Sequence, residues 1–91
     1  MATMVTQHEV GEYQSWRGVY DEVAGLRSQH GCTAERVWRA PEDPNNVLVL
    51  HEFPTLAQAQ AFLTDPGLKD AMGRASVAGP PRIELWEDVD G

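Results

Sequence analysis

The segment Val47–Phe53, which reads VLVLHEF, begins with four apolar residues in succession and therefore has no polar face. A strand with water on one side alternates apolar and polar residues, whereas an unbroken apolar run is typical of a strand covered on both sides. The preceding segment Cys32–Arg39 does alternate, and a compact turn over Pro41–Asn46 separates the two. The sequence thus predicts an antiparallel hairpin whose second strand is central in its sheet.

Two regions have the helical period. In Glu12–His30 the apolar residues recur every three or four positions, and Gly31 follows as a stop signal. A second helix is predicted to begin at Thr55 with a capping box, and Asp65 caps a short continuation to about Ala75. The inner faces carry Tyr13, Trp16, Tyr20, Val23 and Leu26 in the first helix and Leu56, Ala59, Phe62 and Leu63 in the second.

Strand-like segments near both ends, Met4–Val10 and Arg82–Val89, complete the order β-α-β-β-α-β. Right-handed crossovers around the hairpin predict an α+β, ferredoxin-like βαββαβ fold, with both helices on one face of a four-stranded antiparallel sheet. The other face is then bare, although Val47–Phe53 needs cover there and Trp38 and Trp86 compete for a place on it. We therefore expect a homodimer in which two sheets pack into a dimeric α/β barrel.

Composition excludes several classes of protein. The 91 residues fit a single domain, 1–91, and 7 basic against 14 acidic residues give a formal charge of −7, which disfavours a nucleic-acid partner. No apolar run approaches the ~18 residues of a membrane span, and the N-terminus lacks the basic and apolar parts of a secretory signal. The single cysteine, Cys32, cannot form an internal disulfide, so we expect a cytoplasmic protein.

Short motifs are distributed along nearly the whole chain: EYQSW at 12–16, EDPNN before VLVLHEF at 42–53, DPGLKDAM at 65–72 and SVAGPP at 76–81. Together they resemble the antibiotic biosynthesis monooxygenase-like family of dimeric α/β-barrel proteins. The resemblance implies the homodimeric fold described above. Members include cofactor-free oxygenases of aromatic polyketides and haem-degrading enzymes, related dimeric barrels include lactone isomerases and polyketide cyclases, and many members have no assigned function.

The haem-degrading members use a histidine on the second helix, a nearby tryptophan and an asparagine on the first strand. This chain has no histidine after His51, no tryptophan between Trp38 and Trp86 and no asparagine before Asn45. We therefore expect neither haem nor another cofactor.

His8 and His51 are the candidate catalytic residues, since they lie on predicted strands that are neighbours in this topology. Imidazoles titrate near neutral pH and can act as general base and acid. Proton abstraction next to a carbonyl is the step that oxygenation, lactone isomerisation and cyclisation share. A structural role, with both imidazoles hydrogen-bonded at the sheet or the dimer interface, stays open. Two histidines are too few for a zinc site, and Glu52 points to the other face, so no metal is expected.

Aromatic and apolar side chains are the candidate substrate-binding residues. Trp16 and Tyr20, which also suit the core, can form the wall of a pocket between helix and sheet. Trp38 and Trp86 can line that pocket or the dimer interface, and Arg36, on the same face as Trp38, can hold an enolate or lie in solvent. The full set is Trp16, Tyr20, Arg36, Trp38, Phe62, Met72 and Trp86.

The sequence and the resemblance together favour a cofactor-independent enzyme that acts on an aromatic or polyketide-like molecule by proton abstraction followed by oxygenation. The alternatives are a polyketide cyclase or lactone isomerase on the same scaffold, and a non-catalytic ligand-binding or accessory dimer.

Overall fold

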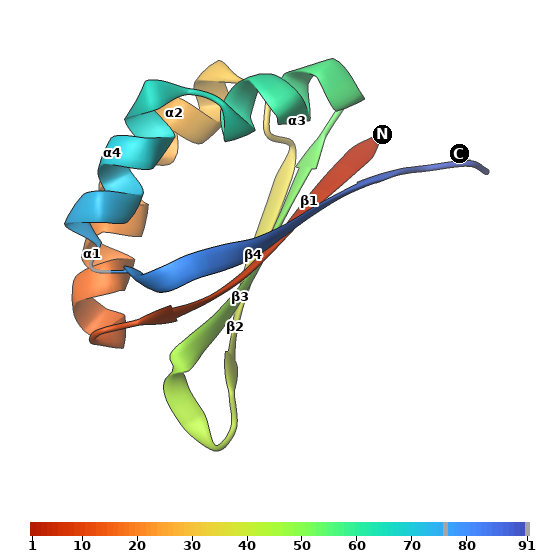
Figure 1. Cartoon of the computed structure of the whole chain (residues 1–91). Coiled ribbons are helices and arrows are strands. Elements are labelled where there is room, and N and C mark those ends of the chain that lie inside the picture. The colour runs from red at the N-terminus through yellow and green to blue at the C-terminus, as the bar shows by residue number, and fades with distance from the viewer. Residues whose placement is uncertain (76, 91) are drawn as a thin grey trace.

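The computed structural model describes residues 1–75 and 77–90, in which one antiparallel sheet of order β2-β3-β1-β4 has helices on one face (Figure 1). This confirms the predicted α+β, ferredoxin-like fold. No helix of the described residues is long and apolar enough to cross a membrane. In chain order the elements are β1 (Ala2–Val10), α1 (Tyr13–Glu22), α2 (Ala24–Gln29), β2 (Ala34–Ala40), β3 (Asp43–Phe53), α3 (Leu56–Leu63), α4 (Pro66–Arg74) and β4 (Val77–Glu87).

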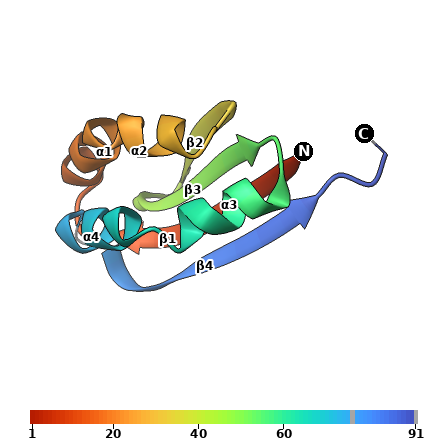
Figure 2. The same cartoon turned by 90° about the horizontal axis from the view of Figure 1, so that it is seen from above.

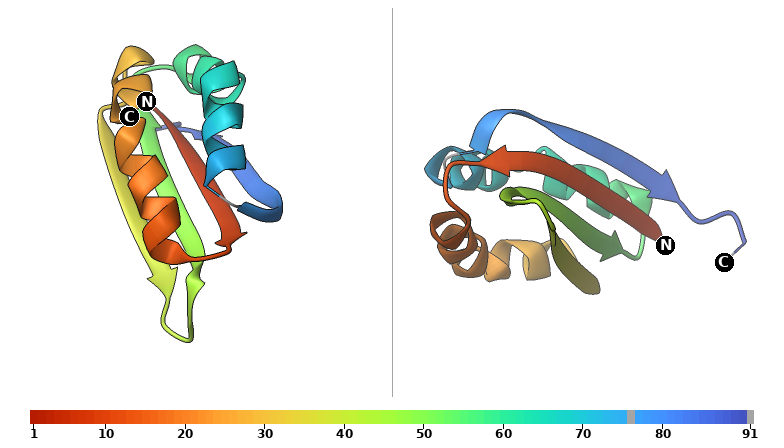
Figure 3. Two further views of the ribbon diagram at one scale, coloured as in Figure 1. Left: turned by 90° about the vertical axis from the view of Figure 1, so that its left-hand side faces the viewer. Right: turned by 90° about the horizontal axis from the view of Figure 1, so that it is seen from below.

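The helices form two pairs that lie side by side over the sheet. Figure 3 shows α1 and α2 in front of β2 and β3, and α3 and α4 in front of β1 and β4. The pairs touch where α1 contacts α4. The tip of the β2–β3 hairpin extends past the helices (Figure 1), and the C-terminal segment runs outward beyond β4 when seen from above (Figure 2). The core therefore lies between the helical layer and the two central strands.

The register of β1 against β3 decides which side chains are buried. Met4 lies opposite His51 and His8 opposite Val47. Because side chains alternate along a strand, one set from each strand points at the helices. Both candidate histidines belong to this inward set. Its members are Ala2, Met4, Thr6, His8 and Val10 on β1 and Val47, Val49, His51 and Phe53 on β3.

The outward set makes the opposite face of the sheet partly apolar. Leu48 and Trp38, which lie opposite each other in the β2–β3 ladder, are 37% and 38% exposed, and Trp86 on β4 is 60% exposed. Val5 and Leu50 are half-buried between them. The apolar run of β3 thus has Val47 and Val49 under the helices and Leu48 and Leu50 on this open face, which we define by Val5, Trp38, Leu48, Leu50 and Trp86.

The first predicted helix is two helices, which is a correction. Helix α1 ends at Glu22 and α2 begins at Ala24, with Val23 between them at φ −97° and ψ 22°. The β-branched Val23 and the nearby Gly25 both disfavour a helix interior, which explains the break.

The bounds of all four strands differ from the prediction, by one or two residues in β1 and β2 and by more in β3 and β4. The hairpin turn is only Pro41–Glu42, because β3 begins at Asp43, which pairs with Ala40 of β2. Asn46 pairs with Glu9 near the end of β1, and Gln7 Nε2 donates to Asn46 Oδ1 at 2.6 Å. Strand β4 extends from Val77 to Glu87, through Gly79-Pro80-Pro81. It is an edge strand, where proline is tolerated because one row of backbone groups has no ladder partner.

Gly31 closes the first helical region in the left-handed backbone region, at φ 82°, and a Cβ there would lie 2.5 Å from Gln58 Nε2. We expect Gly31→Ala to lower the free energy of unfolding by about 1–2 kcal/mol, because L side chains disfavour this conformation and Gln58 must move. Gly18→Ala is the control, since no atom of the described residues lies within 4 Å of its Cβ in the middle of α1; it should raise stability by about 0.5–1 kcal/mol. Denaturant unfolding measures the stability of both variants. Equal changes in the free energy of unfolding would contradict the left-handed conformation of Gly31.

Candidate functional site

A cavity of about 60 Å³ lies between the helices and the sheet. Strands β1 and β3 supply its floor, and α1, α3 and α4 supply aromatic and aliphatic walls. An apolar cavity with a few polar groups is typical of a small-molecule site. Six of the candidate residues line it: His8, Trp16, Tyr20, His51, Phe62 and Met72.

A second, more open hollow of about 400 Å³ lies between α4 and β4. Leu68, Met72 and Ile83 line both spaces, so these three side chains separate the hollow from the inner cavity. Ligand sites usually enclose about 300–1,000 Å³, so a polycyclic ligand needs more room than the inner cavity alone provides. Methionine side chains are flexible, so Met72 is the most adaptable of the three side chains between the two spaces.

Aromatic rings pack in a row along one wall of the cavity. Trp16 stacks on Tyr20 with ring centroids 4.9 Å apart, and the His8 ring meets Trp16 edge-on at 5.5 Å. On the other side His51 meets Phe62 edge-on at 5.4 Å. These contacts fix the orientation of both imidazoles beneath the helices.

The floor of the cavity carries polar atoms that have no hydrogen-bond partner among the described residues. They are Thr6 Oγ1, both ring nitrogens of His8, and His51 Nδ1, and all are buried. His8 and Thr6 are two residues apart on β1, about 7 Å, and His51 lies opposite Met4, two residues further along. A buried polar atom without a partner disfavours folding by about 1–3 kcal/mol, so this row is a candidate set of contacts for a polar ligand.

Burial keeps both imidazoles neutral. Desolvation lowers the pKa of His8. It also lowers the pKa of His51, to about 4, and the positive charge of Arg27 acts in the same direction while Glu35 opposes it. A neutral imidazole has one nitrogen that can accept a proton and one that donates, so at pH 7 each ring is in the protonation state of a general base.

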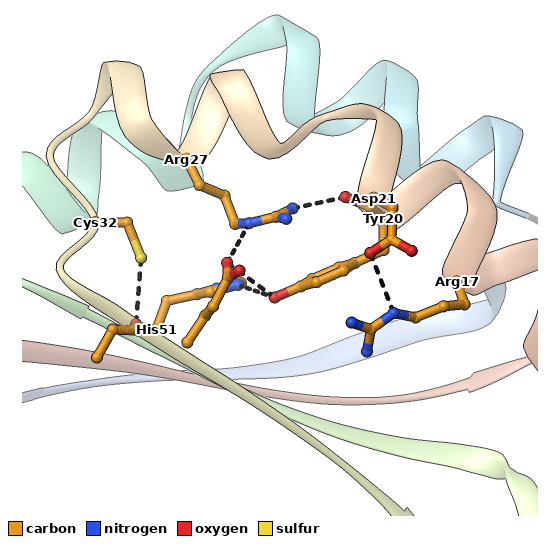
Figure 4. Close-up of polar contacts among 8 residues, drawn as sticks. Arg17, Tyr20, Asp21, Arg27, Cys32 and His51 are labelled. Carbon is orange, nitrogen blue, oxygen red and sulfur yellow. Dashed lines mark hydrogen bonds and ion pairs between the residues drawn. The ribbon is translucent and has the colours of Figure 1, made fainter.

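Tyr20 connects His51 to an ion pair between α2 and β2 (Figure 4). Its hydroxyl lies 3.0 Å from His51 Nε2 and 3.3 Å from Glu35 Oε2. Arg27 Nε donates to the same Glu35 oxygen, Arg27 Nη1 donates to the Tyr20 carbonyl at 2.8 Å, and the guanidinium lies 3.8 Å from the Tyr20 ring centroid. Burial raises the pKa of Tyr20, so the hydroxyl keeps its proton.

Arg36, Trp38 and Trp86 do not line the cavity, which corrects their expected place in the pocket. The strand register turns all three to the other side of the sheet, opposite Leu50, Leu48 and Thr3. There the Arg36 guanidinium lies 5.2 Å from the Trp38 ring, and Trp86 Nε1 donates to Glu84 at 3.2 Å. The sequence allowed two positions for Trp38 and Trp86, in the pocket or at the other face of the sheet. The structure places both on the open face.

Thr6, Arg27 and Glu35 also belong to the site, although they were not predicted from the sequence. Arg27 follows Tyr20 by seven residues, which is the spacing of one helical face, and this was the available signal. Glu35 lies two residues before Val37 on β2, so both side chains point to the inward side of the sheet. The only sequence signal for Thr6 is its position two residues before His8 on the same strand.

The model of the antibiotic biosynthesis monooxygenase family matches residues 6–74 of the chain. Among solved structures, SnoaB, a cofactor-independent oxygenase from Streptomyces nogalater, is 14% identical with a TM-score of 0.81, over 99% of this chain and 94% of that one. A Nitrosomonas europaea protein of unknown function is 21% identical with a TM-score of 0.76, over 99% and 90%. An antibiotic biosynthesis monooxygenase is 15% identical with a TM-score of 0.74, over 98% and 99%. At these identities the structural likeness shows a shared fold, and no curated protein matches the chain.

The lowered pKa of His51 makes stability depend on pH. Between about pH 4 and 6.5 the unfolded chain binds a proton at this residue and the folded chain does not, so the free energy of unfolding falls as pH is lowered through that window. We expect this contribution to be on the order of 3 kcal/mol and to be absent from His51→Gln. Denaturant unfolding of both proteins at pH 7 and pH 4.5 measures it. An equal loss of stability in the two would show that His51 is not buried as a neutral group.

Proposed function

The chain belongs to the antibiotic biosynthesis monooxygenase family, and we propose that it is a cofactor-independent enzyme that oxygenates an aromatic or polyketide-like molecule. In this proposal a general base removes a proton from a carbon next to a carbonyl, and the resulting carbanion reacts directly with O₂. When a methylene becomes a carbonyl, one O₂ is consumed, one oxygen atom enters the product and the other leaves as water. This balance requires no redox cofactor.

One observation carries the proposal: two neutral imidazoles, with nitrogens that have no partner among the described residues, form part of the floor of a cavity with mostly apolar and aromatic walls. Such walls suit a flat aromatic substrate, and unpartnered nitrogens suit its hydroxyl and carbonyl groups. We assign His51 as the general base. His8 and Thr6 then hydrogen-bond the oxygen substituents and stabilise the charge that develops when the proton leaves.

We expect wild-type protein, without added flavin or metal, to consume oxygen with a hydroxylated anthrone as substrate. His51→Gln should lower kcat by roughly a hundredfold or more, because a positioned general base contributes on that scale. His30→Gln is the matched control, since His30 binds Asp65 at 2.7 Å and does not line the cavity. An oxygen electrode and the absorbance of the product measure the rates.

Other outcomes of this experiment separate the remaining possibilities. Turnover that continues without oxygen would replace oxygenation by cyclisation or isomerisation, which share the proton abstraction. Binding of aromatic ligands without turnover of any of them would favour a non-catalytic binding protein. Equal rates in the wild type and His51→Gln would contradict the role of His51 as base.

We further propose that the protein is a homodimer in which the open face of each sheet packs against the other. This face combines large exposed side chains with half-buried aliphatic ones at the centre of the sheet, which is typical of an interface. Light scattering should give twice the mass of one chain at micromolar concentration. Leu48→Glu should shift the protein towards monomer, because it buries a charge in the interface. Val89→Glu, at a position 93% exposed and outside the open face, should remain dimeric. A wild-type monomer would refute the proposal.

A further inference from the structure

We propose that Glu35 is a positioning residue that acts through Tyr20 to hold the proton of neutral His51 on Nε2, which leaves Nδ1 as the nitrogen that accepts the substrate's proton. The second half of this inference rests on the proposed function, in which His51 is the base. The first half concerns only where a proton lies in the free protein, and it can be tested without a substrate.

The hydroxyl of Tyr20 has two polar neighbours and one proton. His51 Nε2 lies 3.0 Å from its oxygen and Glu35 Oε2 lies 3.3 Å from it. If the hydroxyl donates to Glu35, then His51 must donate its Nε2–H to the Tyr20 oxygen. If the hydroxyl donates to His51, then Nε2 carries no proton and Nδ1 does. The direction in which Tyr20 donates therefore determines the tautomer of His51.

The ion pair decides between the two directions. An ionised carboxylate has acceptors and no donor, and Glu35 Oε2 already accepts from Arg27 Nε. Arg27 is in turn held by the Tyr20 carbonyl and by the face of the Tyr20 ring. If the hydroxyl pointed at His51, its oxygen would face the carboxylate oxygen at 3.3 Å with no proton between them. Donation from Tyr20 to Glu35, and from His51 Nε2 to Tyr20, satisfies every partner in the chain.

The remaining nitrogen, His51 Nδ1, is then the only basic atom of the ring. It is buried and has no partner among the described residues, and His51 lines the cavity. Burial of both rings, which raises the pKa of Tyr20 and lowers that of His51, keeps the protons in this arrangement near pH 7. Glu35 does not line the cavity, so it contributes to the site through its hydrogen bond with Tyr20, its ion pair with Arg27 and its charge.

Nitrogen-15 NMR of the imidazoles tests the position of the proton, because a ring nitrogen that carries hydrogen is distinguished from one that does not by its chemical shift. The chain has three histidines, and the spectrum of His51→Gln identifies the signals of His51. We expect Nε2–H in the wild type. Glu35→Met removes the acceptor, so Tyr20 should turn to His51 and move the proton to Nδ1. Glu35→Gln keeps one oxygen that can accept from both Arg27 and Tyr20, so it should retain Nε2–H.

Two further variants complete the test. Glu42→Met is the matched control, since Glu42 is exposed in the β2–β3 turn, and its spectrum should equal that of the wild type. Tyr20→Phe keeps the ring that Arg27 covers and removes only the hydroxyl, so the preference for Nε2–H should be lost. This variant provides the same readout if Glu35→Met does not fold. Nδ1–H in the wild type, or unchanged Nε2–H in Glu35→Met and Tyr20→Phe, would overturn the inference.

Kinetics separate this inference from the proposed function. With a substrate that the wild type oxygenates, Glu35→Met should lower kcat about tenfold or more with little change in KM, and Glu35→Gln should stay near the wild-type rate. Loss of activity in Glu35→Met without a change of tautomer would refute the positioning role and leave the function intact. A tautomer change in Glu35→Met with full activity in His51→Gln would refute His51 as base and leave the proton assignment intact.

Discussion

The pairing of β1 with β3 is the constraint on which the rest of this structure depends. It brings His8, Thr6 and His51 to one face of the sheet at steps of two residues, and it places that face beneath the helices. A slip of one residue on β1 would turn His8 and Thr6 to the open face, away from the helices and the cavity. The candidate site is therefore a property of the sheet register, and the helices complete it by excluding water.

The polar groups between the helices and the sheet fall into two sets, one hydrogen-bonded and one without partners among the described residues. Tyr20, Glu35 and Arg27 form a hydrogen-bonded chain, and this chain also engages one nitrogen of His51. Thr6, His8 and the other nitrogen of His51 are buried without partners among the described residues. Unpartnered groups disfavour folding, and they concentrate where a protein meets a ligand. The hydrogen-bonded set stabilises the geometry of the site, and the set without partners is available to bind a ligand.

Local patterns in the sequence were enough to predict the fold. The period of Glu12–His30, the capping Thr55 and the alternation of Cys32–Arg39 each depend on near neighbours, and their order selects the ferredoxin-like topology. The sequence alone also shows which residues of a strand share a face, so Trp38 and Val37 are predicted to point to opposite faces of the sheet. Which side meets the helices depends on the partner strand and on the helices above it, so the sequence left open whether Arg36, Trp38 and Trp86 lie in the pocket or outside it, and the register places them outside. Glu35 was missed for the same reason, because its role depends on partners eight and fifteen residues away.

The proposed chemistry requires that His8 and His51 are buried, neutral and available to one ligand. A titration of the three histidines by NMR, with and without a hydroxylated polycyclic aromatic, tests it most directly. In the free protein His51 should stay neutral until the pH approaches about 4, and the aromatic ligand should shift the signals of His8 and His51 together while those of His30 stay in place. A His51 that titrates near pH 6.5, or a ligand that leaves both signals unchanged, would contradict the account.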